Sequence, residues 1–132
     1  MVDHCDSFER RHAVGWVVPP AGVAVPDSLA SMLVAFSISP VAQDPSGSVT
    51  EAVAAAVRVV RESGLPHETN AMFTNIEWEW DEVMAVVKRA VDVVAEVSPR
   101  VGLVLKADIR PGHEGQLTAK VERIEEALRR AE

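Results

Sequence analysis

The chain has 132 residues, 48% of them hydrophobic and 25% charged, with a formal net charge of −7 at pH 7. This length suits one domain with one hydrophobic core, and the acidic balance argues against nucleic acid as a partner, because phosphate recognition needs a cationic face. Cys5 is the single cysteine, so an intramolecular disulfide is excluded and a reducing, cytoplasmic location is expected.

The first 31 residues differ in character from the remainder. Residues 13–26 are apolar, but Pro19, Pro20, Gly22 and Pro26 interrupt them, so a membrane-spanning helix is not expected and the resemblance to a secretory signal is weak. We predict that residues 1–31 form an extension outside the fold and that residues 32–132 form the folded domain. No association with a membrane is expected.

Residues 33–41 alternate, with Val34 and Phe36 on one face and small or polar residues on the other, which predicts a strand. A helix is predicted to begin at Ser48, because Glu51 three residues later completes a capping box. Valines and alanines then recur at helical spacing as far as Val60, and the glycine and proline at 64 and 66 mark the end of this helix.

Residues 67–72 and 73–78 favour strands and predict a hairpin, although no glycine marks the turn. A second helix is predicted from Trp80 to Val97, with Trp80 as an anchor in the core. Residues 101–110 predict a further strand, and residues 117–130 predict a last helix with apolar residues at every third or fourth position. The order therefore predicts a four-stranded antiparallel sheet of the βαββαβ type, with both main helices on one face.

The other face of this sheet would be left without a cover. It is predicted to carry Leu33, Ala35, Ser37, Val104 and Lys106. Such a face is too apolar to remain in water as one patch. We therefore expect the protein to associate with itself through the sheet and, because a core of small side chains leaves little internal space, to bind any ligand at a subunit boundary.

Four carboxylates crowd the junction between the second strand of the hairpin and the second helix, at Glu77, Glu79, Asp81 and Glu82. Acidic residues stabilise the start of a helix, which carries a partial positive charge. Alternatively, Glu77 faces a pocket and recognises a cationic or amidine-like ligand through charge-assisted hydrogen bonds. Both interpretations remain open at this point.

Four stretches together resemble the thiamine-binding protein family, the small single-domain relatives of the YkoF type. They are residues 37–40 (SISP), 48–65, 72–83 (which includes IEWEWDEV) and 120–128. The resemblance implies a ferredoxin-like α+β fold with an extra C-terminal helix. It also implies homodimers or homotetramers joined through their sheets, which bind thiamine or its hydroxymethylpyrimidine part near a subunit interface without chemistry and without a cofactor.

The candidate ligand-binding residues combine this resemblance with the predicted strands. Glu77 would accept hydrogen bonds from an aminopyrimidine, Trp78 would stack on a heteroaromatic ring or a thiazolium cation, and hydroxyl, amide and carboxylate groups on the sheet would add polar contacts. The full set is Ser37, Ser39, Asn70, Thr74, Glu77, Trp78 and Asp108. Phe73 and Trp78 stand where the family pattern has glycines, so their larger side chains are expected to reshape the pocket.

Other functions have weaker support. The four histidines and the cysteine lack the spacing of a metal site, and no phosphate-binding loop, dinucleotide fingerprint or nucleophile elbow is present. The alternatives are a small cofactor-free enzyme of the dimeric ferredoxin-like type, with Trp78 and His67 lining its pocket, and a structural oligomer with a vestigial pocket. No paired acid and base supports the enzyme.

Overall fold

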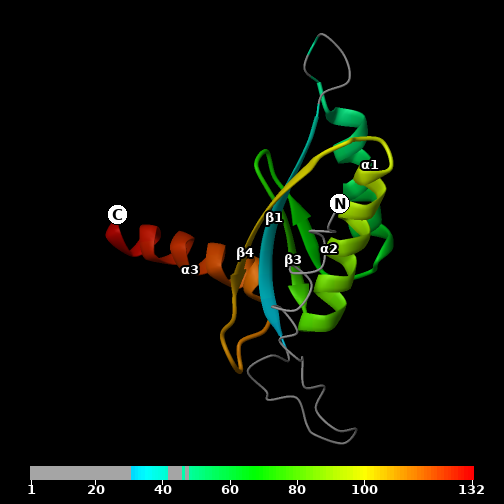
Figure 1. Ribbon diagram of the computed structural model, residues 1–132. Coiled ribbons are helices and arrows are strands. Elements are labelled where there is room, and N and C mark those ends of the chain that lie inside the picture. The colour runs from blue at the N-terminus through cyan, green and yellow to red at the C-terminus, as the bar shows by residue number, and fades with distance from the viewer. Residues whose placement is uncertain (1–30, 42–45, 47) are drawn as a thin grey trace, which may run out of the picture.

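The computed structural model describes residues 31–41, 46 and 48–132. Within these residues the elements follow the predicted order (Figure 1). They are β1 (Met32–Pro40), α1 (Thr50–Glu62), β2 (His67–Thr69), β3 (Thr74–Trp78), α2 (Trp80–Ala95), β4 (Val101–Asp108) and α3 (Gln116–Ala131). Of the predicted N-terminal extension only Ser31 is described, so that boundary stays a prediction.

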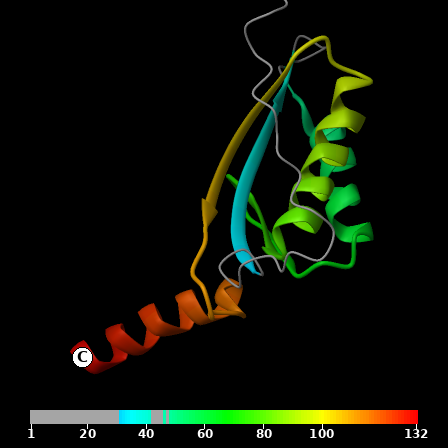
Figure 2. The same cartoon turned by 60° about the horizontal axis from the view of Figure 1, so that its bottom comes forward.

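The four strands form one sheet in the order β2-β3-β1-β4, with every neighbouring pair antiparallel. Helices α1 and α2 lie together on one face of the sheet, whereas α3 leaves the end of the sheet on the opposite side and projects away from the body (Figure 2). The predicted α+β, ferredoxin-like βαββαβ fold with an extra C-terminal helix is confirmed.

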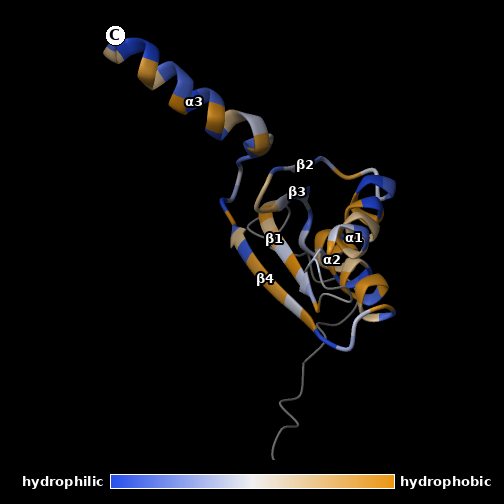
Figure 3. Cartoon of the chain, turned by 90° about the horizontal axis from the view of Figure 1, so that it is seen from above, coloured by the Kyte–Doolittle hydropathy of each residue, from blue (hydrophilic) through white to orange (hydrophobic). Residues whose placement is uncertain are grey.

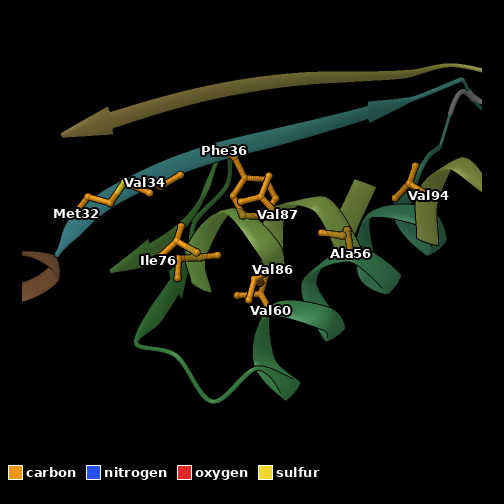
Figure 4. Close-up of a cluster of buried hydrophobic side chains, with 11 residues drawn as sticks. Met32, Val34, Phe36, Ala56, Val60, Ile76, Val86, Val87 and Val94 are labelled. Carbon is orange, nitrogen blue, oxygen red and sulfur yellow. The ribbon is translucent and has the colours of Figure 1, made fainter. Parts of the chain in front are cut away.

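The core lies between the sheet and the two covering helices, and small branched side chains fill it (Figure 4). Met32, Val34 and Phe36 on alternate positions of β1 are at most 3% exposed, as the alternating pattern predicts. The helices contribute mainly valine and alanine, and β3 contributes Ile76, which is fully buried.

Two predictions about helix starts are wrong. Helix α1 begins at Thr50 with no side-chain cap, because the Ser48 hydroxyl lies 3.1 Å from that of Thr50 instead of capping the backbone N–H of Glu51. Trp80 is the first residue of α2 and is 39% exposed, so it does not anchor the core. A first-turn position faces outward here because the buried stripe of α2 begins at Val83.

The hairpin turn between β2 and β3 is built by Asn70. Its backbone N–H donates to the carbonyl oxygen of Phe73 at 2.9 Å, and its side-chain Oδ1 accepts from the backbone N–H groups of Met72 and Phe73, also at 2.9 Å. An asparagine that hydrogen-bonds backbone groups ahead of it can close a turn without glycine. This explains why the hairpin forms although the usual sequence signal for the turn is missing.

The uncovered face of the sheet, meaning the face opposite α1 and α2, carries the residues predicted for it. The register of β1 with β4 places Leu33 opposite Asp108, Ala35 opposite Lys106 and Ser37 opposite Val104. Directly opposed residues project to the same face of an antiparallel sheet, so these pairs share the uncovered face, where Val104 is 60% exposed.

Helix α3 also presents an apolar surface to solvent. Val121, Ile124 and Leu128 lie at helical spacing and are between 55% and 60% exposed, and hydrophobic positions recur along the whole projecting helix (Figure 3). None of the helices in the described part of the chain is long and apolar enough to cross a membrane. The exposed stripe is therefore an amphipathic surface on a helix that projects from the body.

Candidate functional site

A hollow opens where the pairing of strands on one side of β1 stops. β1 pairs with β3 only as far as Phe36, which lies opposite Thr74, whereas its pairing with β4 continues to Pro40. β1 thus runs past the end of the β2–β3 hairpin (Figure 1). We call the resulting space the hairpin pocket, since the turn of the hairpin forms one wall and α1 forms another.

The hairpin pocket has a volume of about 340 Å³, at the lower end of the range of roughly 300–1,000 Å³ typical of small-molecule sites. Its lining combines apolar side chains of α1 with polar groups of β1 and the hairpin. The lining residues are Phe36, Ser37, Ile38, Ser39, Val53, Ala56, Val57, Thr69, Asn70, Ala71, Met72, Phe73 and Thr74.

The backbone of β1 supplies part of the polar lining. On the side away from β4, residues 37–40 pair with no strand in the described part of the chain. In an antiparallel strand alternate residues direct both N–H and C=O to the same side, so this edge offers donors and acceptors along a line. The Ser37 and Ser39 side chains add hydroxyl groups that can donate or accept.

The hairpin contributes further polar groups. Thr74 is 7% exposed, and its hydroxyl lies 3.5 Å from that of Thr69. Because the Oδ1 atom of Asn70 already accepts two backbone hydrogen bonds, its amide nitrogen is the atom left to donate to a ligand. The pocket therefore presents an apolar wall beside several donors and acceptors.

The predicted site residues divide between separate places. Ser37, Ser39, Asn70 and Thr74 come together in the hairpin pocket. Glu77 and Trp78 instead line a second hollow of about 350 Å³ beside the start of α3, which we call the α3 hollow.

The two hollows do not merge within one subunit. Thr74 and Glu77 are three residues apart on β3, or about 10 Å, and project to opposite faces of the sheet. The two hollows share no lining residue, so the predicted set is divided between two places in one subunit.

Glu77 caps α3. It is 6% exposed; its Oε2 atom accepts from the backbone N–H of Gln116 at 2.7 Å, and its Oε1 atom accepts from the N–H of Leu117 at 3.4 Å. Backbone N–H groups at a helix start lack partners within the helix, and the helix dipole favours negative charge there. Glu77 thus complements a helix start, but that of α3 and not that of the neighbouring α2.

Asp108 lies in neither hollow. Its carboxylate forms an ion pair with the Lys120 ammonium and thereby links β4 to α3. The hydrogen bond from Lys120 and the positive charge of that group hold the pKa of Asp108 below its ordinary value of 3.8. Since the pKa is lowered in the folded state, this pair stabilises α3 above that pH and is lost as the pH falls through the lowered pKa.

The sequence did not identify the α1 wall of the hairpin pocket. Val53, Ala56 and Val57 belong to a regular helical stripe, which predicts core packing. Ala56 is indeed buried, whereas Val53 and Val57 are only half-buried and line the hollow. Val53 and Val57 lie at the margin of the helical stripe, and this position was the one indication in the sequence that they line a pocket.

Metal binding finds no support in the structure. Within residues 31–41, 46 and 48–132 no group of three or more histidine, cysteine or acidic side chains is arranged to hold an ion. His67 and His113 each place the Nδ1 atom against a nearby backbone carbonyl oxygen, at 2.8 and 3.0 Å. Both histidines therefore have local hydrogen-bonding roles.

Comparison with known proteins gives consistent matches. Residues 34–125 match the model of the family described as "Thiamine-binding protein". A UPF0045 protein from Mycobacterium bovis is 52% identical over 103 residues, which are 77% of this chain and 99% of that protein. A UPF0045 protein from the cyanobacterium Synechocystis is 37% identical over 79 residues, covering 59% of this chain and 65% of that protein.

Solved structures share the fold. A hypothetical protein from Methanocaldococcus jannascii is 32% identical, with a TM-score of 0.66 over 74% of this chain and 98% of its own. A putative thiamine biosynthesis/salvage protein from Thermotoga maritima is 22% identical, with a TM-score of 0.60 over 70% of this chain and 98% of its own. At that identity the second likeness is evidence for the fold alone.

Proposed function

This chain belongs to the thiamine-binding protein family, and on that premise we propose that it binds thiamine, or the hydroxymethylpyrimidine part of thiamine, without catalysing a reaction. The observation that carries the proposal is the free edge of β1 in the hairpin pocket, which lies beside an apolar wall of α1. An aminopyrimidine is planar and apolar on its faces, and it has donors and acceptors along its rim.

The ring would lie with its rim against β1 and the hairpin. Its amino group and ring nitrogens would hydrogen-bond the β1 backbone, Ser37, Ser39 and the Asn70 amide, each contact contributing about 0.5–1.5 kcal/mol. Its faces would contact Val53 and the half-buried Phe73. Phe73 stands where the family pattern has glycine, so here an aromatic ring forms part of the wall.

The α3 hollow is a second candidate position for the ligand. Glu77, Trp78 and Asp108 stay predicted ligand contacts, and the first two line this hollow beside Glu79 and Glu114. Trp78 is 43% exposed, so its ring is available to a cation such as thiazolium, an interaction of about 0.5–2 kcal/mol. We place the pyrimidine in the hairpin pocket because more of the predicted residues gather there.

Calorimetric titration of the purified protein with thiamine and with hydroxymethylpyrimidine tests the proposal. We expect saturable binding of at least one of them, and we expect the ligand to be recovered chemically unchanged after prolonged incubation. Conversion of the ligand would favour the cofactor-free enzyme. Absence of binding to either compound would contradict the proposed function and leave the structural oligomer as the remaining alternative.

We further propose that two or more copies associate through the uncovered face of the sheet. Val104 is exposed on the uncovered face, and α3, which carries the exposed apolar stripe, projects from the body on that side of the sheet (Figure 2). Exposed apolar surfaces of this kind mark protein interfaces. Ser37 lies on the uncovered face and also lines the hairpin pocket. A second copy on this face would therefore lie beside the ligand, as expected for a site at a subunit interface.

Val104→Glu is expected to shift the protein toward the monomer, because it places a charge in the proposed interface. The fold itself should be unaffected, because Val104 is already exposed in the single subunit. The measurement is the sedimentation coefficient at micromolar concentration. Val97→Glu is a matched control, since Val97 is similarly exposed, 59% against 60%, but follows α2 at the end of the covered layer. Equal association of both variants and the unmodified protein would contradict the proposed interface.

A further inference from the structure

The hairpin pocket adjoins an open, shallow surface along one side of α1. We call this surface the arginine hollow, and all of its lining residues belong to α1 or directly precede it. Both spaces are lined by Val53 and Val57, so they adjoin along one turn of the helix. Its lining residues are Val49, Thr50, Val53, Ala54, Val57, Arg58 and Arg61.

The charge of the arginine hollow contrasts with that of the protein. The chain carries a net charge of −7, but among the residues that the structure describes no acidic side chain lines either the hairpin pocket or the arginine hollow. Arg58 and Arg61 are both exposed, and neither is in an ion pair with any residue that the structure describes. Their positive charge is therefore available to an anion.

The geometry of α1 brings these two guanidinium groups close to the ligand. Arg58 and Arg61 are three residues apart and hence neighbours on the helix surface. Arg61 lies one turn after Val57, about 6 Å along the axis, a span that an arginine side chain can reach back across. A group leaving the hairpin pocket over Val57 would meet both arginines.

We propose, on the basis of the proposed function, that the ligand is a phosphate ester of a pyrimidine-containing molecule. Its pyrimidine occupies the hairpin pocket and its phosphate lies between Arg58 and Arg61. Guanidinium groups pair with phosphate through parallel, charge-assisted hydrogen bonds. Unphosphorylated thiamine has no negative charge to offer these residues, so the arginine hollow gives a physical reason for the protein to distinguish the two forms.

The test compares thiamine with thiamine monophosphate by calorimetric titration at one fixed ionic strength. We expect the unmodified protein to bind the monophosphate at least tenfold more tightly. The double variant Arg58→Gln/Arg61→Gln is expected to lose this preference while its affinity for thiamine stays within twofold. Arg89→Gln/Arg100→Gln removes the same charge from two exposed arginines outside both spaces and is expected to retain the preference.

The outcomes separate this inference from the proposed function. Equal affinity of the unmodified protein for both compounds, or a preference that survives in Arg58→Gln/Arg61→Gln, would overturn the phosphate site and leave thiamine binding intact. A preference lost equally in the control double variant would show an effect of net charge alone and would also overturn it. Failure to bind either compound would overturn the proposed function together with this inference.

Discussion

Glu77→Gln is expected to lower the free energy of unfolding by about 1.5–3 kcal/mol, the range for a hydrogen bond to a charged group. Glu77 is nearly buried and both its oxygens accept backbone N–H groups at the start of α3. Glutamine has nearly the same shape but no charge, and its amide group would direct N–H at those same donors. Urea denaturation measures the change in the free energy of unfolding. Faster hydrogen exchange of the backbone amides of residues 116 and 117 would show that the start of α3 is no longer held against β3.

Glu79→Gln is the matched control for Glu77→Gln. Glu79 is exposed, lines the same hollow and precedes α2 without a side-chain capping bond. This variant should retain its stability and the exchange protection of α3. Unchanged stability and unchanged protection in Glu77→Gln would contradict the capping role. The contact with ligand that the sequence predicts for Glu77 would appear separately, as weaker binding measured on the folded protein.

Val57→Trp is expected to reduce the affinity for ligand by at least about 100-fold, or roughly 2.7 kcal/mol. Val57 is half-buried on α1, lines the hairpin pocket and does not belong to the cluster of residues packed against the core. An indole at this position would fill much of a hollow of about 340 Å³ without displacing core side chains. The measurement is the dissociation constant of whichever compound the unmodified protein binds.

Ala85→Trp provides the control for an added indole. Ala85 is exposed on α2 and lines neither the hairpin pocket nor the α3 hollow. This variant should bind ligand normally, and both variants should keep the circular dichroism spectrum of the parent. Normal binding by Val57→Trp would exclude the hairpin pocket as the ligand site and would favour the α3 hollow.

Local patterns predicted the elements and their order well. The alternation in β1 placed Val34 and Phe36 in the core, and the helical stripes gave α1, α2 and α3. Details of local structure that depend on a single hydrogen bond were harder to predict. Ser48 and Glu51 have the spacing of a capping box, but the hydroxyl of Ser48 lies against Thr50 instead. Asn70 closes the hairpin turn with its own side chain, so the turn forms without the glycine by which a hairpin is usually recognised in a sequence.

The candidate site was predictable in part. Ser37, Ser39, Asn70 and Thr74 gather in one pocket, as residues at neighbouring strand ends should. The partner of Glu77 could not be deduced, because the start of α3 lies 39 residues further along the chain and its position depends on how that helix leaves the sheet. Nor could periodicity distinguish Val57, which lines the pocket, from Val60, which is fully buried in the core.

The central place of β1 has a consequence for how the chain acquires its structure. Of the four strands described, β1 is synthesised first, yet it pairs with β3 and with β4, which is synthesised last. Contacts between such distant segments slow folding, because a long loop must close before they form. While the ribosome is still adding residues beyond 100, the backbone groups on the β4 side of β1 have no strand partner, and a nascent chain at this stage is prone to aggregate.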